Sequence, residues 1–195
     1  MTIRAMLAGL MLTLPMACAA TTGGDAGAMP AMRWDHRPEA VIWTSRTLDA
    51  LDPAANALPQ IVPEDIATWC PAYPQAGAQD RAAFWAGLLS ALAKHESTWN
   101  PAASGGGGRW IGLVQIAPAT ARSYGCAAQN TAALKDGAEN LSCAVRIATV
   151  QVARDNKVAG ARGTEGLGRD WAPFRNAAKR AEMAAWTRAQ DYCQL

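Results

Sequence analysis

Hydrophobic and polar positions along residues 80–96 (DRAAFWAGLLSALAKHE) follow the period of an α-helix. At about 100° per residue, the bulky apolar side chains and one acidic side chain fall on a single stripe. The members of this stripe are Trp85, Leu88, Leu89, Leu92 and Glu96. Ser90 and Lys94 fall on the opposite side, which we expect to face solvent. The pattern predicts a helix that begins at Asp80 and ends soon after Glu96, because the following "STWNP" does not continue it.

A second amphipathic pattern covers residues 140–153 (NLSCAVRIATVQVA). Its apolar positions recur at i, i+4, i+7 and i+11, which predicts a helix with one buried face. These positions are Leu141, Val145, Ala148 and Val152. We expect this helix to pack beside the helix that carries Glu96. Half of the chain is hydrophobic, alanine dominates, and neither repeats nor alternating strand patterns occur, so the fold class is mainly α.

The N-terminal part reads as three successive segments. Residues 1–19 combine a cationic start, a short apolar run and an A-x-A-like site, which is typical of a signal peptide. Cleavage there is the favoured interpretation, and lipidation at Cys18 is the alternative. Residues 20–60 are rich in Gly, Ala and Pro and predict a flexible or loosely packed arm. We expect residues 61–195 to form the folded domain.

Cysteine usage agrees with export. Cys18 is either removed with the signal peptide or lipidated. Four cysteines therefore remain in the oxidising compartment, and they permit three pairings. We predict Cys126–Cys143 and Cys70–Cys193, the second of which ties the two ends of the domain together. A zinc site is set aside, because the chain has no close C-x-x-C pair and only two histidines.

Charge and glycine content exclude several function classes. A formal net charge of +2 does not indicate nucleic acid or a membrane surface as a partner. Four consecutive glycines, residues 105–108, lack the Lys-Ser/Thr of a P-loop and the spacing of a dinucleotide fingerprint. No cofactor is predicted. The glycines instead suggest a mobile loop that lets a bulky polymer approach the backbone.

Glu96 is the main candidate for chemistry. A carboxylate on the apolar stripe of a helix, at the carboxyl end, is disfavoured in its charged form by burial and by the helix dipole. Both effects raise its pKa and favour a neutral acid near pH 7. The competing interpretation is a solvent-exposed residue at a helix end. Gln115, within the apolar run "GLVQIAP", offers amide donors and an acceptor for sugar hydroxyls or acetamido groups.

Three motifs, "ESTWNPAA", "GLVQIAPATARSYG" and "NLSCAVRIA", occur in this order. Together they resemble the soluble lytic transglycosylase (SLT) family of the lysozyme superfamily, whose pattern is similar to E-S-x-x-N-P, G-L-x-Q-I-x-P-x-T-A and a later N-[IL]. The resemblance implies a lysozyme-like helical domain with Glu96 as catalytic acid. By position, Ser97, Gln115 and Asn140 correspond to residues at the family's sugar-binding cleft.

One family element is absent. The SLT pattern commonly ends in a Tyr-Asn segment whose tyrosine approaches the catalytic acid, and this chain has "GLGRDWAPFR" there. Trp171 is a candidate aromatic wall for a sugar ring, with core packing as the alternative. Tyr124 is available to orient Glu96, or is structural. The sequence identifies no second catalytic carboxylate; Asp170, in this segment, is a possible one.

The resemblance implies a peptidoglycan substrate. Glu96 would cleave the β-1,4 bond between N-acetylmuramic acid and N-acetylglucosamine and leave a 1,6-anhydro sugar. The alternatives are a lysozyme-type muramidase, a non-catalytic peptidoglycan-binding or envelope-assembly protein, and a lysin of a secretion apparatus or phage. We expect a monomer without a membrane span in the bacterial periplasm; an outer-membrane lipoprotein or a secreted protein are the alternative locations.

Overall fold

The computed structural model describes Met1 and residues 29–194. The predicted signal peptide and Cys18 lie outside the described residues. The helices are α1 (Ala40–Ala50), α2 (Ile66–Trp69), α3 (Ala78–Ser97), α4 (Pro118–Ser123), α5 (Thr131–Leu134), α6 (Gly137–Asp155), α7 (Ala172–Arg175) and α8 (Ala177–Arg188). Three 3-10 turns are η1 (Leu58–Gln60), η2 (Gly166–Arg169) and η3 (Asp191–Cys193), and two short strands are β1 (Ser104–Gly105) and β2 (Trp110–Ile111). The predicted mainly α class is confirmed.

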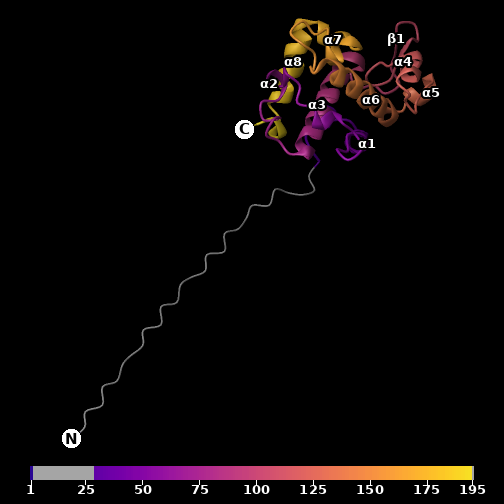
Figure 1. Cartoon of the computed structure of the whole chain (residues 1–195). Helices are drawn as coiled ribbons and strands as arrows, with labels where there is room; N and C mark the ends of the chain where they lie inside the picture. The colour runs from indigo at the N-terminus through magenta and orange to yellow at the C-terminus, as the bar shows by residue number, and fades with distance from the viewer. Residues whose placement is uncertain (2–28, 195) are drawn as a thin grey trace.

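The long helix α3 lies at the centre of the molecule (Figure 1). Every residue from 82 to 93 is buried, so the helix has no solvent face along this stretch. The predicted apolar stripe is buried as expected, but the predicted exposure of Ser90 is wrong. The Ser90 hydroxyl accepts a hydrogen bond of 2.9 Å from the backbone N–H of Arg33, because the N-terminal segment covers this side of the helix.

That N-terminal segment is part of the core. Residues 20–60 were expected to form a flexible or loosely packed arm, but in residues 30–60 helix α1 packs against α6 and α3. Four large side chains of the segment are buried: Trp34, Trp43, Leu51 and Leu58. The indole N–H of Trp34 also donates to the Thr44 hydroxyl at 2.8 Å. The predicted arm is therefore wrong for these residues, because a few large apolar side chains outweigh a composition of small residues.

Helix α6 begins at Gly137, three residues before the predicted start. Asp136 caps it, since its side chain accepts hydrogen bonds from the backbone N–H groups of Ala138 and Glu139. The four predicted core positions of the helix are buried. Its main neighbours are α1 and η2, however, and not the helix of Glu96 as expected.

The glycine run forms the tip of an antiparallel hairpin. β1 pairs with β2 in the register Ser104–Ile111 and Gly105–Trp110. Gly106, Gly107 and Gly108 all have positive φ, a conformation that other residues rarely adopt. The sequence predicted a loop here and missed the hairpin, whose strands are two residues long. Figure 1 shows β1, α4 and α5 gathered at one side of the molecule, with α2 and α8 at the other.

Two disulfides close the fold, and both predicted pairings are confirmed. Cys126 is bonded to Cys143 and fixes the end of α4 to α6. Cys70 is bonded to Cys193 and joins the end of α2 to the C-terminal turn η3. Among residues 29–194, no helix combines the length and apolarity needed to cross a membrane.

Candidate active site

Glu96 lies in the last turn of α3 and is half-buried. Burial raises its pKa to about 7, in the direction predicted from its place on the apolar stripe. Lys179 of α8 and Arg175 of α7 oppose the shift, because a nearby cation favours the carboxylate. A substantial fraction of Glu96 is therefore protonated at neutral pH and can donate a proton.

The backbone just after Glu96 is in an uncommon conformation. Thr98 and Trp99 have φ of 52° and 56°, in the left-handed region that non-glycine residues seldom adopt. The indole N–H of Trp99 donates to the Ser90 carbonyl at 2.9 Å and holds the reversed chain against α3. Such strain persists where surrounding contacts fix it, and it is common at active sites. Gln115, the other polar candidate, also has a positive φ, of 51°.

The carboxylate of Glu182 anchors the C-terminal end of α3. Glu182 of α8 accepts from Lys94 at 2.8 Å and contacts His95 Nε2 at 2.7 Å, and it also pairs with Arg33. The hydrogen bond from Arg33 is the main reason why the pKa of Glu182 lies well below its usual value. The cluster joins the N-terminal segment, α3 and α8, and its member His95 directly precedes Glu96 in the sequence.

Ser97 joins the end of α3 to the loop that carries Gln115. Its hydroxyl donates to the Leu113 carbonyl at 2.8 Å and accepts from the backbone N–H of Asn100 at 3.2 Å. These bonds use the hydroxyl within the protein, so its direct effect here is to fix the loop beside Glu96. The sequence had placed Ser97 among substrate-binding residues.

Gln115 stands where this loop turns back on itself. Its side-chain amide donates to the Gly112 carbonyl at 2.8 Å, and Ile111 and Ile116 form a β-bridge across the turn. Its side-chain oxygen lies so close to Gly105 that a Cβ there would approach it to 2.5 Å. The glycine at 105 therefore lets the amide pack beside the hairpin. Gln115 is half-buried and lines a groove.

Asn140 and Trp171 both support the loop that carries Gln115. The sequence did not predict this role for Asn140, whereas core packing was the stated alternative for Trp171. The Asn140 side chain is fully buried; it accepts from the Val114 N–H and donates to the carbonyls of Ile111 and Leu134. Trp171 is 3% exposed, and its indole N–H donates to the Val114 carbonyl at 2.8 Å. Both side chains thus hydrogen-bond to the backbone of the loop that carries Gln115. The expectation that Asn140 lines the cleft is therefore corrected. Trp171 is packed in the core and also lines the groove described below.

Tyr124 does not hydrogen-bond to Glu96. Its hydroxyl donates to Asp170 Oδ2 at 3.2 Å and accepts from Gln151 Nε2 at 2.6 Å. Gln151 Nε2 also donates to Asp170 Oδ2 at 2.5 Å. Sequence reasoning missed Gln151, which has no local signal, and left Asp170 in an unplaced loop.

A narrow groove of about 50 Å³ brings several of these residues together. It is lined by Trp110, Gln115, Thr120, Asp170 and Trp171, with smaller apolar residues between them. Two larger hollows, of about 590 and 680 Å³, lie between α2 and α8 and beside α6; Gln115 lines neither of them, and Glu96 lines none of the three. Size alone therefore does not locate the site. No cluster of metal-ligating side chains occurs among residues 29–194.

Comparisons with known proteins found one family model and several similar solved structures. The family model "Transglycosylase SLT domain" matches residues 74–161. No curated protein matches the chain. Among solved structures, wild-type DslA is 27% identical with a TM-score of 0.76, and a glutamate-to-glutamine variant of DslA is 27% identical with a TM-score of 0.77. A second such variant is 26% identical with a TM-score of 0.76. Each match covers 86% of this chain and all of the DslA chain.

Proposed function

The chain belongs to the transglycosylase SLT family of the lysozyme superfamily, and from this premise we propose that it is a lytic transglycosylase of the bacterial cell wall. Its substrate is the β-1,4 bond between N-acetylmuramic acid and N-acetylglucosamine, and Glu96 is its catalytic acid. The two disulfides suit an exported protein, and we place it in the periplasm. We propose that it acts as a monomer on glycan strands.

The state of Glu96 is the observation that carries this proposal. The side chain ends a buried helix, is half-buried, and has a pKa of about 7. A group that must first donate and then accept a proton works best when its pKa lies near the ambient pH. The glutamate-to-glutamine variants of DslA add support, because that substitution was made in a similar structure at two positions.

The reaction uses one carboxyl group twice. Protonated Glu96 donates its proton to the glycosidic oxygen as the bond from this oxygen to C1 of the muramic acid breaks. The 2-acetamido group of the same sugar stabilises the positive charge that develops at C1. The Glu96 carboxylate then removes the proton of the C6 hydroxyl, and O6 attacks C1 to form the 1,6-anhydro ring. No water is consumed, so the products together have the mass of the substrate.

The charges around Glu96 suit this route. A hydrolase with two carboxylates would place the second one within about 5–9.5 Å of the first. The charged groups that shift the pKa of Glu96 are instead the cations Lys179 and Arg175. They stabilise the carboxylate that exists between the two proton transfers. Tyr124 does not replace the missing family tyrosine, because its hydroxyl donates to Asp170. Among the described residues, no side chain hydrogen-bonds to Glu96.

Digestion of purified sacculi tests the proposal. Wild-type protein should release muropeptides that end in 1,6-anhydro-muramic acid, identified by mass spectrometry. Glu96→Gln should release none and still bind the sacculi, while the matched control Glu139→Gln should act like wild type.

Three results contradict the proposal in different ways. Products heavier by one water would identify a lysozyme-type muramidase. Full activity in Glu96→Gln would remove Glu96 from the reaction. Binding without turnover by the wild-type protein would indicate a non-catalytic peptidoglycan-binding protein.

A further inference from the structure

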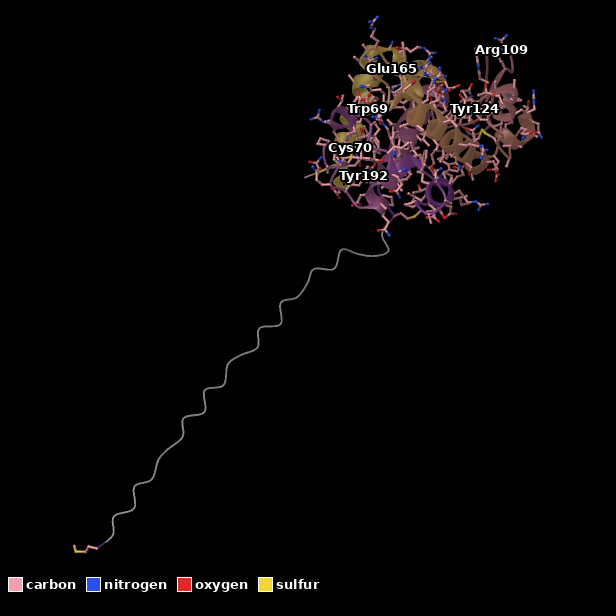
Figure 2. The ribbon with its side chains drawn as sticks, in the orientation of Figure 1. Trp69, Cys70, Arg109, Tyr124, Glu165 and Tyr192 are labelled. Carbon is pink, nitrogen blue, oxygen red and sulfur yellow. A yellow bond between two sulfur atoms is a disulfide. The ribbon has the colours of Figure 1, made fainter. Side chains whose placement is uncertain are left out.

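Three side chains from distant parts of the chain meet beside the groove. Tyr124 follows α4, Gln151 lies on α6, and Asp170 follows η2. Figure 2 shows Tyr124 on the side of the molecule that also carries Arg109 of the hairpin, away from Cys70 and Tyr192. The three form a closed set of hydrogen bonds, in which Gln151 donates to both partners and Tyr124 donates to Asp170.

The arrangement engages only one of the two carboxylate oxygens of Asp170. Both donors bind Oδ2, whereas Oδ1 has no hydrogen-bond donor within residues 29–194. Asp170 itself is exposed and lines the groove together with Gln115. An ionised carboxylate only accepts hydrogen bonds, and bonds from hydroxyl groups to it are stronger than bonds between neutral groups. Oδ1 is thus free to accept from a ligand in the groove.

Stability does not explain this arrangement. Gln151 is 6% exposed, and its side-chain oxygen has no partner in the part of the chain that the structure describes. Leaving a buried acceptor unpaired destabilises the folded state. An exposed carboxylate contributes little to folding in return. Burial and the neighbouring Asp170 also raise the pKa of Tyr124, so its hydroxyl keeps its proton and stays a donor.

The same groove also has an aromatic surface. Trp110 is 44% exposed at the start of β2, and its ring packs over Gly106 of the hairpin tip. Sites for small polar ligands combine aromatic surface with a few fixed hydrogen-bonding groups. A sugar ring has an apolar face, which suits the indole, and hydroxyl groups at its edge, which suit Asp170 and Gln115.

We propose that Asp170, held in place by Tyr124 and Gln151, is a saccharide-binding residue of the groove. Its Oδ1 accepts hydrogen bonds from hydroxyls of a sugar ring that lies against Trp110. Tyr124 and Gln151 act as positioning residues, since they touch the carboxylate and not the sugar. The inference rests on the proposed function for its ligand class, a glycan strand, and assigns a binding role that does not involve the scissile bond.

Titration of chitotetraose, the tetramer of N-acetylglucosamine, tests the inference by calorimetry on the non-cleaving Glu96→Gln protein. Adding Asp170→Ala should raise Kd by about tenfold or more, because a hydrogen bond to a charged group contributes about 1.5–3 kcal/mol. Tyr124→Phe should raise Kd less, since one of the two donors to Asp170 remains. The matched control Asp191→Asn removes an exposed acid at the other end of the molecule and should leave Kd unchanged.

Each other outcome has a defined meaning. An unchanged Kd for Asp170→Ala, in a protein with an unchanged melting temperature, overturns the inference. Failure of the Glu96→Gln parent to bind the tetramer overturns it as well. With otherwise wild-type protein, Asp170→Ala should raise KM more than it lowers kcat, and the reverse split would make Asp170 a catalytic residue instead. Wild-type protein that binds the tetramer but never cleaves sacculi would refute the proposed function and leave this binding site standing.

Discussion

Two opposing effects keep the pKa of the Glu96 carboxyl group near neutral pH. Burial in the last turn of α3 favours the acid, and Lys179 and Arg175 favour the carboxylate. A group with burial alone would hold its proton too firmly to act as a base afterwards. A group with the cations alone would lack the proton needed for the first step. The balance suits a residue that performs both transfers.

This balance lowers the stability of the folded protein above neutral pH. The pKa of Glu96 is 4.5 unfolded and about 7 folded, so between these values the folded state binds more protons and stability falls as pH rises. Glu96→Gln removes the ionisable group. It should raise the free energy of unfolding at pH 8 by up to about 3 kcal/mol, at 1.36 kcal/mol per pKa unit, and change it little at pH 4. Urea unfolding at both pH values measures this; an equal effect at the two would show that Glu96 does not titrate as described.

Lys179 should set the alkaline limit of activity. It is the stronger of the two cations that lower the pKa of Glu96, so Lys179→Met should raise this pKa. Glu96 would then keep its proton to higher pH, and the alkaline limb of the kcat/KM profile should move upward. Arg188→Met, at the far end of the same helix, is the matched control and should leave the limb in place. An unmoved limb in Lys179→Met would mean that another group controls it.

At the scale of elements, the sequence pattern predicted helices better than their surroundings. The apolar periods of α3 and α6 placed both helices and their buried positions correctly, because periodicity records which face is buried. It does not record what covers the buried face, so the neighbours of α6 were missed. Nor does it show that a polar face is covered, so the N-terminal segment over Ser90 was missed as well. The hairpin was missed because its strands are too short to show alternation. Asn140 matched a family motif by position, and only the structure shows that it supports the loop.

Asn140 should therefore be a stability residue of the Gln115 loop. Asn140→Leu would leave the buried carbonyls of Ile111 and Leu134 and the N–H of Val114 without these partners. At about 1–3 kcal/mol for each group, we expect a loss of at least about 3 kcal/mol in the free energy of unfolding. Asn130→Ala, which removes the exposed cap of α5, should cost only about 1 kcal/mol. Equal losses in urea unfolding would argue against the anchoring role.

Across the whole molecule, long-range contacts decide where the domain begins. The cysteine pairing was predictable, because four cysteines allow only three combinations. The packing of residues 30–60 was not, because Trp34 and Trp43 stand in a segment that is otherwise rich in small residues. The network of Tyr124, Gln151 and Asp170 was also hidden, since its members are far apart in sequence and bear no shared motif.

The N-terminal segment should be indispensable to the stability of the domain. Trp34 is fully buried and bonded to Thr44, so Trp34→Ala should lower the free energy of unfolding by about 3–5 kcal/mol. Ile42→Ala is the control within the same segment: Ile42 is 61% exposed, and its loss should change stability by less than about 0.5 kcal/mol. Because this segment also brings Arg33 to Glu182, we expect Trp34→Ala to weaken the anchor at the end of α3 and lower activity. Unfolding curves that coincide with wild type would show instead that residues 30–60 are the loose arm that their composition suggests.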